Sequence, residues 1–451
     1  MAAKTLNISA LIDERPVGGY QWLIIALCAA VVFLDGFDAQ AIGYAAPSLI
    51  KAWRLKPPQL GPVFSAGLIG LMLGALLIAP LADRLGRRPV IITASILFGL
   101  FTLATAWATD INQLLVLRFL TGLGLGGCMP NGIALTSEYA PTRSRSLMVM
   151  IMFNGFTLGS LVGGIIAARL MPAFGWQSVF VVGGVLPLVL APVMAFTVPE
   201  SIRFMVVSKA RPERILRAVR RVAPGANMDA STQFEVELQT KARMSVRELF
   251  RGGRATRTVL LWTVFFMSLL DVYMLVNWLP TAMNSVGASV STAVMIGVSL
   301  QLGAFLGSIP LGWIMDRFGA RLTMFPCYLL AAICIALIGF VASTSIPLTF
   351  VVVFLAGLGV IGGQTAANAV AATSYPTEVR STGVGWSLGI GRIGSIVGPA
   401  LAGELLAMQV SIREIFLLSA IPAAVGAFAS LGLGGRARPA AAADPAVSPA
   451  E

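Results

Sequence analysis

Five charged residues lie inside long apolar stretches of this 451-residue chain, namely Asp35, Asp38, Arg118, Asp271 and Arg392. A charge at the centre of a bilayer costs at least about 2.5–3.5 kcal/mol on insertion scales, so it needs a partner or a function. A carboxylate can bind and release a proton, and a guanidinium can hold a carboxylate through two hydrogen bonds. These residue types indicate proton binding and anion binding within the apolar region.

Asp35 and Asp38 are three residues apart, so they share one face of a predicted helix. At 1.5 Å per residue, Asp38 lies roughly 12 Å inside the outer end of its helix and Arg118 roughly 9 Å inside that of its own, so these two can form an ion pair. Asp35 lacks that partner and is the better proton carrier. The alternative is a permanent salt bridge that clamps two helices together.

Asp271 follows Asp35 by 236 residues, in a similar local sequence, so we expect it to face the same cavity from a second half of the molecule. It either takes part in proton coupling or forms a hydrogen bond to the backbone or a serine of a neighbouring helix. Arg392 lies roughly 14 Å from the inner end of its helix, near mid-membrane. It either binds an anionic substrate or pairs with an aspartate.

Aromatic and amide side chains occur near these charges and are candidates to bind a substrate. They are Phe37, Tyr44, Phe153, Asn154, Tyr273, Asn277, Trp278, Gln364, Asn368 and Trp386. Aromatic residues of membrane proteins often pack between helices or form interfacial belts. Beside a buried cation, however, they would suit a flat ring that carries a carboxylate.

The composition argues against a soluble enzyme, because 57% of the residues are hydrophobic and only 12% are charged. Soluble domains carry about 25% charged residues. The chain has no histidine, which excludes a Ser-His-Asp triad, a histidine-ligated zinc and an imidazole proton relay. Cys28, Cys128, Cys327 and Cys334 stand singly in apolar runs, so we expect neither a disulfide framework nor a metal site.

Twelve apolar runs of about 20 residues predict transmembrane helices. They lie near residues 21–46, 60–82, 90–109, 112–138, 146–169, 178–198, 258–280, 290–313, 322–342, 346–372, 383–407 and 413–434. The first run carries two aspartates and has no clean cleavage site, so it does not look like a signal peptide.

The distribution of basic residues predicts the topology. With the N-terminus in the cytoplasm, 25 of the 32 lysines and arginines fall on the cytoplasmic side, five on the opposite side and two inside the runs. This bias places both termini of a multi-pass protein in the cytoplasm, and we expect it in a bacterial inner membrane. The net charge of +12 therefore reflects topology, and we expect no nucleic-acid partner.

The runs divide the chain into five parts. We expect a cytoplasmic tail over residues 1–20, a six-helix bundle over 21–198, a cytoplasmic loop over 199–257, a second six-helix bundle over 258–434 and a disordered tail over 435–451. Four arginines of the central loop, Arg214, Arg217, Arg220 and Arg221, recur at helical spacing and predict a short surface helix. This loop either lies solvated against anionic lipid headgroups or forms a specific partner site.

The two halves repeat each other in sequence. A shift of 235 residues superposes the glycines at 122, 124 and 127 on those at 357, 359 and 362, and residues 158–163 on 393–398. A shift of 233 aligns residues 83–88 with 316–321. The predicted fold is an all-α integral membrane protein with twelve helices in two pseudo-symmetric bundles, and such parallel repeats place a substrate site between the halves near the bilayer midplane.

Glycines spaced four apart predict close helix packing. Gly155, Gly159 and Gly163 share one helix face, as do Gly394 and Gly398 in the second half. Small residues at this spacing allow two backbones to approach closely, in ordinary packing or at a sliding gate.

The two Asp-Arg-x-Gly loops, which begin at Asp83 and Asp316, resemble the inter-helix signature of the major facilitator superfamily, although Ala79 stands where that signature usually has glycine. Within the superfamily, several motifs resemble the aromatic acid:proton symporters. They are Asp35-Gly-Phe-Asp38, Arg118-Phe-Leu-Thr-Gly, Met129-Pro-Asn with Ser-Glu138-Tyr, Pro199-Glu-Ser-x-Arg203, Asn277-Trp278-Leu-Pro and Gly389-Ile-Gly-Arg392.

This resemblance implies the major facilitator fold and proton-coupled import, by alternating access, of an aromatic carboxylate such as 4-hydroxybenzoate, protocatechuate or benzoate. The expected partners are that acid, protons and the lipid bilayer; we expect a monomer that the proton gradient drives without a cofactor. The resemblance also implies functional roles for Asp35, Asp38, Arg118, Glu138, Asp316, Arg380 and Arg392.

Charged residues at the inner ends of the helices form a predicted gating group. It comprises Asp83, Arg84, Arg88, Glu138, Arg145, Asp316, Arg317 and Arg380. We expect Asp83 and Asp316 to form alternative bridges between helices that hold an inner gate shut. The alternative is that these loops only enforce topology.

Two classes of function compete. An integral-membrane enzyme or a receptor is the second, but an enzyme would need a polar catalytic cluster, and none stands out in the sequence, so we expect a secondary transporter. Among transporters, the alternative is an exporter, or a symporter of another organic acid or metabolite, because the fold alone does not fix direction or substrate.

Overall fold

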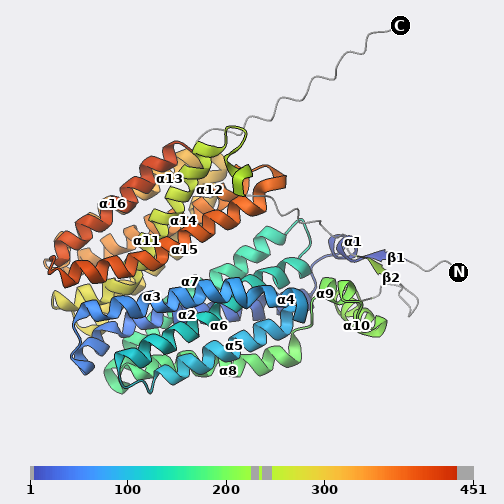
Figure 1. Ribbon diagram of the computed structural model, residues 1–451, viewed down its shortest axis with the longest axis horizontal. Coiled ribbons are helices and arrows are strands. Elements are labelled where there is room, and N and C mark those ends of the chain that lie inside the picture. The colour runs from blue at the N-terminus through green and yellow to red at the C-terminus, as the bar shows by residue number, and fades with distance from the viewer. Residues whose placement is uncertain (1–4, 225–232, 236–245, 434–451) are drawn as a thin grey trace, which may run out of the picture.

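The computed structural model describes residues 5–224, 233–235 and 246–433 of the chain, and the predicted tail over 435–451 lies outside them. Within the described residues, 12 helices are long and apolar enough to cross a membrane, which confirms the predicted number. They form two bundles, which we call the N-terminal half and the C-terminal half (Figure 1).

The N-terminal half contains six of these long helices. They are α2 (Gly19–Trp53), α3 (Leu60–Leu77), α5 (Arg87–Thr105), α6 (Ile111–Tyr139), α7 (Arg145–Phe174) and α8 (Gln177–Thr197). Short helical turns connect some of them, namely η1 (Pro57–Gln59), η2 (Ala79–Leu81) and α4 (Ala82–Leu85). At the start of α6, the side chain of Asp110 accepts hydrogen bonds from the backbone amides of Asn112 and Gln113 and thereby caps the helix.

The C-terminal half contains the other six long helices. They are α11 (Ala255–Ser285), α12 (Val290–Phe318), α13 (Ala320–Val341), α14 (Ile346–Ser374), α15 (Thr377–Ala407) and α16 (Ile412–Leu431). Three of them begin with a serine cap, at Ser289, Ser345 and Ser411.

The helices pack in the same pairs in both halves. The pairs α2–α7, α3–α6, α5–α6 and α5–α8 correspond to α11–α15, α12–α14, α13–α14 and α13–α16. The turns repeat as well: Gly86 before α5 and Gly319 before α13 have φ values of 101° and 83°, a backbone conformation that favours glycine. These two glycines end the Asp-Arg-x-Gly loops, so the predicted repeat is present in the structure.

The predicted close packing at glycines is also present in both halves. A side chain on Gly159 of α7 would overlap the backbone carbonyl of Phe33 in α2, and a side chain on Gly394 of α15 would overlap that of Phe266 in α11. Glycine at these positions therefore lets two helix backbones touch.

The N-terminal segment and the central loop lie at one end of the molecule, which we call the linker end (Figure 1). Their elements are β1 (Thr5–Asn7), α1 (Ile8–Asp13), α9 (Ile202–Val207), α10 (Pro212–Val222), β2 (Gln233–Glu235) and η3 (Val246–Phe250). The strands β1 and β2 pair in parallel, a small β element that the all-α prediction missed. Helix α10 confirms the predicted surface helix.

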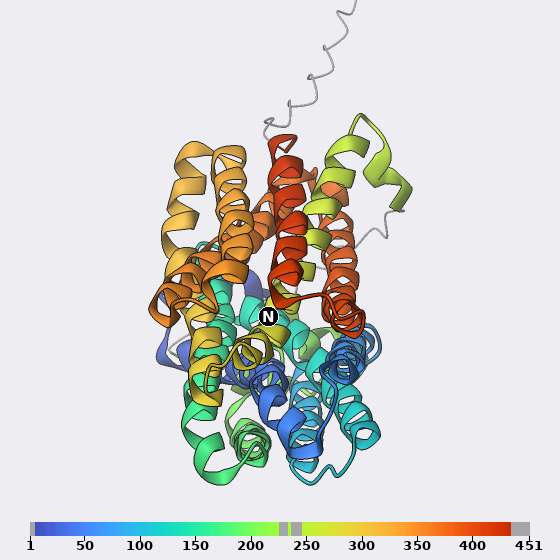
Figure 2. The ribbon, with the colours of Figure 1, turned by 90° about the vertical axis from the view of Figure 1, so that its left-hand side faces the viewer.

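The two halves are joined near the end opposite the linker end, and we call this contact the joint. One hydrophobic core cluster there contains residues of both halves, whereas the clusters at the linker end each belong to one half. Phe64 of α3 packs edge-on against Trp278 of α11, with ring centroids 5.1 Å apart. The Ser65 hydroxyl donates a 3.0 Å hydrogen bond to the carbonyl oxygen of Ile396 in α15. Figure 2 views the halves from the joint end, with the C-terminal half above.

One face of α15 shows where the halves separate. Its residues Ile396, Pro399 and Gly403 contact α3 of the other half. Gly389 and Gly385 follow on the same face toward the linker end, and a side chain at either position would meet nothing within 4 Å. The space between the halves therefore opens toward the linker end.

Candidate functional site

Asp35, near the middle of α2, and Arg392, near the middle of α15, come from different halves. Asp35 is 1% exposed, and its Oδ1 atom has no hydrogen-bond partner among the described residues. Its charge interacts electrostatically with Arg392 and with Asp38. The site thus contains an incompletely bonded carboxyl group and a cation that share one field between the halves.

Arg392 is half-buried where the face of α15 opens. Its Nη1 atom donates a 3.3 Å hydrogen bond to the Tyr273 hydroxyl of α11. No carboxylate of the described residues lies within ion-pairing distance of Arg392, so the pairing with an aspartate that the sequence left open is not observed there. A guanidinium with donors to spare, beside a phenol, can bind a carboxylate.

Asp38 and Arg118 form the ion pair that the sequence predicts. Their closest atoms, Nη2 of Arg118 and Oδ1 of Asp38, are 3.2 Å apart, and both side chains are buried. The Thr102 hydroxyl donates a 2.7 Å bond to Asp38, and Arg118 also donates a 3.1 Å bond to the Thr121 hydroxyl. The Arg118 guanidinium lies over the Phe180 ring. These contacts occupy Arg118 within the N-terminal half and leave Arg392 as the better placed cation for a substrate.

Asp271 lies inside the C-terminal half. The structure places it near Tyr328 of α13 and does not bring it to Arg392. Neither of its carboxylate oxygens has a hydrogen-bond partner among the described residues, and the hydroxyls of Ser268 and Tyr328 lack one too. The hydrogen bond to a serine or the backbone, the alternative left open by the sequence, is therefore not observed in this part of the chain.

Four of the predicted substrate residues lie away from Arg392. Phe37 packs against Gly163 and Gly183 inside the N-terminal half. Tyr44 belongs to the joint and donates a hydrogen bond to the carbonyl of Ser160. Trp278 also belongs to the joint, where its Nε1 atom donates to the carbonyl of Pro399. Asn277 is buried next to Trp278 and bonds to the carbonyl of Tyr273 in its own helix.

The remaining predicted substrate residues lie on α7, α14 and α15. Asn154 is half-buried on α7. Gln364 and Asn368 of α14 are joined by a 3.3 Å side-chain hydrogen bond, and the Gln364 Oε1 atom has no partner among the described residues. Trp386 of α15 is exposed on one side and stacks on Trp262 of α11, with ring centroids 5.8 Å apart. These groups can contribute polar contacts and a flat aromatic surface.

At the linker end, the gating prediction involves a network within the N-terminal half. Arg87 forms a 2.6 Å ion pair with Asp83 and lies 3.7 Å from Glu138. Glu138 also accepts a hydrogen bond from the Ser201 hydroxyl. Glu200 accepts bonds from the backbone amides of Arg87 and Ser201. The network ties the ends of α4, α5 and α6 to the start of the central loop.

The other predicted gating residues are more dispersed. Arg84 is exposed, and Arg88 donates a hydrogen bond to the carbonyl of Ala195. Arg317 lies over the rings of Trp313 and Phe318, and Arg380 contacts the carbonyl of Tyr375. The side chain of Asp316 lies outside the described part of the structure.

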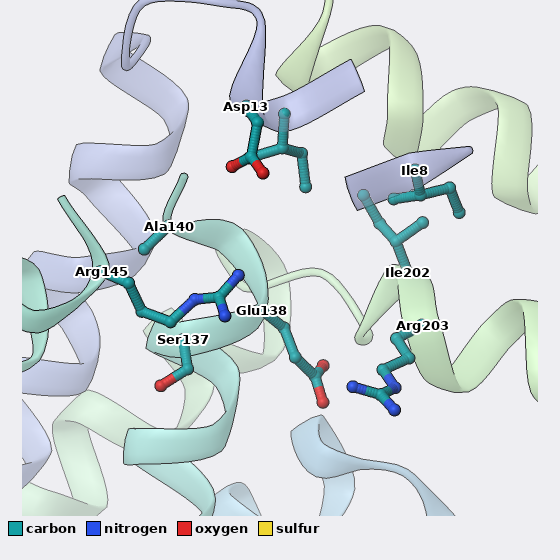
Figure 3. A pocket seen from close by; sticks show the side chains of 9 residues that line it. Ile8, Asp13, Ser137, Glu138, Ala140, Arg145, Ile202 and Arg203 are labelled. Atoms are coloured by element: carbon teal, nitrogen blue, oxygen red, sulfur yellow. The ribbon is translucent and has the colours of Figure 1, made fainter. Parts of the chain in front are cut away.

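Arg145 and Glu138 line a cavity of about 120 Å³ beneath α1 (Figure 3). The side chains of Glu138, Arg145 and Arg203 point into the same space. Asp13 closes it from α1 and accepts hydrogen bonds from the backbone amide and the hydroxyl of Thr142. These bonds hold the pKa of Asp13 below its usual value.

Sequence reasoning missed several residues of these groups. Thr102 and Thr121 complete the Asp38–Arg118 pair, and Arg87 and Ser201 complete the network at the linker end. Arg87 and Ser201 stand inside motifs that the sequence displayed, which was the available signal. Isolated threonines in apolar runs carry no such signal. Among the described residues, no three acidic or cysteine side chains gather closely enough to hold a metal ion.

We expect Asp83→Asn to shift the protein toward the conformation that is open at the linker end. The Asp83 side chain is 70% exposed, so its pair with Arg87 contributes only about 0–1 kcal/mol to the open conformation. A bridge to another helix in a closed conformation would be lost entirely. Labelling of a cysteine introduced as Gly385→Cys, which faces open space, measures the shift.

The natural cysteines are all buried, so a Gly385→Cys protein with Asp83 intact is the matched control. Equal labelling rates in the two proteins would leave Asp83 with a role in topology alone.

The arrangement of twelve membrane-length helices in two repeated bundles, with charges buried between them, defines a polytopic membrane protein with an internal polar site. The family model described as Major Facilitator Superfamily matches residues 28–299 and 261–449. The chain belongs to the major facilitator superfamily, as its motifs predict, and is therefore a transporter and not an enzyme.

Two similar proteins have assigned substrates. The 4-hydroxybenzoate transporter PcaK of Pseudomonas aeruginosa is 44% identical over 432 residues, which cover 95% of this chain and 96% of that protein. The gallate transporter of Pseudomonas putida is 43% identical and covers 95% of each chain. Both likenesses extend over the whole membrane domain.

A solved structure shares the fold. A bacterial homologue of the human lysosomal transporter Spinster, in an inward-facing and unoccupied conformation, superposes with a TM-score of 0.71 at 18% identity. The superposition covers 94% of this chain and 100% of that chain.

Proposed function

We propose that the protein imports an aromatic carboxylate together with protons across a bacterial inner membrane, as a monomer, without a cofactor and with the proton gradient as its energy source. Hydroxylated benzoic acids are the preferred substrate class, because the similar transporters described above carry 4-hydroxybenzoate and gallate. The observation that supports coupling most strongly is the field that Asp35 shares with Arg392 across the two halves.

The mechanism follows from the signs of these charges. An ionised Asp35 attracts the Arg392 guanidinium and opposes the entry of an anion. A proton on Asp35 removes that opposition and leaves Arg392 and Tyr273 to bind the substrate carboxylate. Binding of proton and substrate thus favour each other through one electrostatic coupling, as linkage requires.

The ring of the substrate needs a flat apolar surface beside this carboxylate site. The Trp262–Trp386 stack and the amides of Asn154, Gln364 and Asn368 support this part of the proposal, because they offer stacking surface and partners for ring hydroxyls. Asp271 is a second candidate proton carrier, because its buried carboxyl lacks partners among the described residues.

The orientation follows from the basic residues. The linker end carries most of the lysines and arginines, so we place it, with both termini, in the cytoplasm. The joint then closes the outer side, and the face of α15 at Gly385 and Gly389 opens inward.

Uptake of radiolabelled 4-hydroxybenzoate into proteoliposomes with an imposed pH gradient tests the proposal. We expect accumulation only when the outside is more acidic than the lumen and loss of accumulation with a protonophore. Accumulation that ignores the protonophore would rule out proton coupling. Efflux driven by an inward proton gradient would identify an exporter.

Arg392→Lys should raise the KM for benzoate-type acids at least tenfold, which corresponds to about 1.4 kcal/mol. Lysine keeps the charge but cannot reproduce the planar pair of hydrogen bonds that guanidinium makes with a carboxylate. Initial uptake rates at several substrate concentrations measure the change, with Arg169→Lys, an exposed position on α7, as the matched control.

Binding of the uncharged amide of the same acid separates recognition from scaffolding. The amide should bind wild type and Arg392→Lys equally weakly. If the variant weakens acid and amide by the same factor, Arg392 supports the fold and the carboxylate is held elsewhere.

A further inference from the structure

A groove of about 840 Å³ lies at the linker end of the N-terminal half, outside the space between the halves. One wall is formed by the start of α5 and the end of α8, and the other by α9 and α10. Figure 1 shows α9 and α10 beside the ends of these two long helices. Nothing in the transport cycle proposed above uses this groove.

The groove is strongly basic. Arg88 comes from α5, and Arg214, Arg217 and Arg221 come from one face of α10. Glu200 is the one carboxylate among the lining residues, and it already accepts hydrogen bonds from three backbone amides. The arginines of α10 are exposed, so the groove offers several guanidinium groups to an anion.

The other wall is apolar and faces the side of the bundle. Phe196 of α8 is 89% exposed and Leu85 is 61% exposed, and Ile92 and Pro89 continue the surface along α5. Helices α5 and α8 pack on each other at the edge of the N-terminal half, where the hydrocarbon of a membrane begins. Apolar side chains this exposed are typical of contact with lipid and unusual for contact with water.

The protein itself fixes the position of the basic wall. Ile215, Ala218 and Val219 of α10 are buried in a core cluster that includes Leu11 and Ile12 of α1. Helix α10 therefore holds its apolar face against α1 and its arginines toward the groove. Because this packing anchors α10, the arginines are pre-positioned and do not form a loose basic tail.

We infer that this groove binds one anionic phospholipid of the leaflet at the linker end, with the phosphate at Arg88, Arg214, Arg217 and Arg221 and the acyl chains along Phe196 and Ile92. A phosphate diester supplies the negative charge that the arginines lack, and its chains cover the apolar wall. Juxtamembrane arginines contribute about 1 kcal/mol each to binding anionic lipid, so a set of four supports a lasting contact.

The test is lipid binding to the full-length protein in detergent, measured by native mass spectrometry and by the rise in melting temperature. Dioleoylphosphatidylglycerol is the probe, and dioleoylphosphatidylcholine is the zwitterionic comparison. We expect Arg214→Gln with Arg217→Gln to weaken phosphatidylglycerol binding at least tenfold. Lys209→Gln with Arg211→Gln, exposed basic residues of the same segment that do not line the groove, should leave it unchanged.

Phe196→Ser tests the apolar wall without changing any charge and should also weaken binding. Equal binding by the two double variants would overturn the site. Full competition by inorganic phosphate would show that the groove holds a free anion and not a lipid, and displacement by a polyglutamate peptide would point to an acidic protein partner. Either result would contradict the inference.

Discussion

Asp35→Asn is expected to abolish accumulation of an aromatic acid against its gradient while the protein still folds and inserts. Asparagine has nearly the same shape as a protonated aspartic acid but cannot release a proton, so the variant is fixed in its substrate-binding charge state. The buried position of Asp35 and its electrostatic link to Arg392 make this the largest functional effect we expect from one substitution. Uptake into proteoliposomes with an acidic outside measures it.

Counterflow provides the internal control. Exchange of labelled for unlabelled substrate needs no net proton movement, so Asp35→Asn should retain it at every pH between 5 and 8. Glu404→Gln, an exposed carboxylate near the joint end of α15, is the matched variant that should accumulate substrate normally. Normal pH-driven accumulation by Asp35→Asn would falsify the assignment and move it to Asp271.

Arg118→Ala is expected to cause the largest loss of stability, about 3–5 kcal/mol, because it leaves Asp38 as a buried and unpaired anion. Thr102 alone would remain as a donor to that carboxylate. Thermal melting of purified protein and its yield from membranes measure the loss. Arg169→Ala, at an exposed position, is the control and should stay within about 0.5 kcal/mol of wild type.

The double variant Asp38→Ala with Arg118→Ala separates a pair from two independent contributions. Removing both charges removes the uncompensated anion, so the double variant should melt at a higher temperature than Arg118→Ala alone. Strictly additive losses would show that the two charges do not stabilise each other.

The sequence was sufficient to predict the twelve helices, the repeat and the Asp38–Arg118 pair. Hydropathy reports each membrane-length helix directly, and 1.5 Å per residue converts sequence position into depth. Two residues at matching depth on neighbouring helices can then be paired without knowing the helix rotation.

Helix rotation was the information that sequence could not supply. Asp271 and Arg392 both lie near mid-membrane, but Asp271 lies near Tyr328 inside its own bundle while Arg392 meets the space between the halves. Phe37 and Trp278 were likewise predicted at useful depths but pack elsewhere. The docking of residues 5–13 on the central loop also escaped prediction, because it depends on contacts more than 200 residues apart.

The Asp38–Arg118 pair has no copy in the second half. The positions equivalent by the repeat are Met274 and Val353, both buried and apolar. After duplication of an ancestral six-helix unit, the two copies therefore kept their shape and diverged in chemistry. One copy became a rigid arm that carries an ion pair, and the other carries the cation that faces the substrate path. Mutations in the two copies should accordingly be tolerated differently, with charge changes harming the first through folding and the second through affinity.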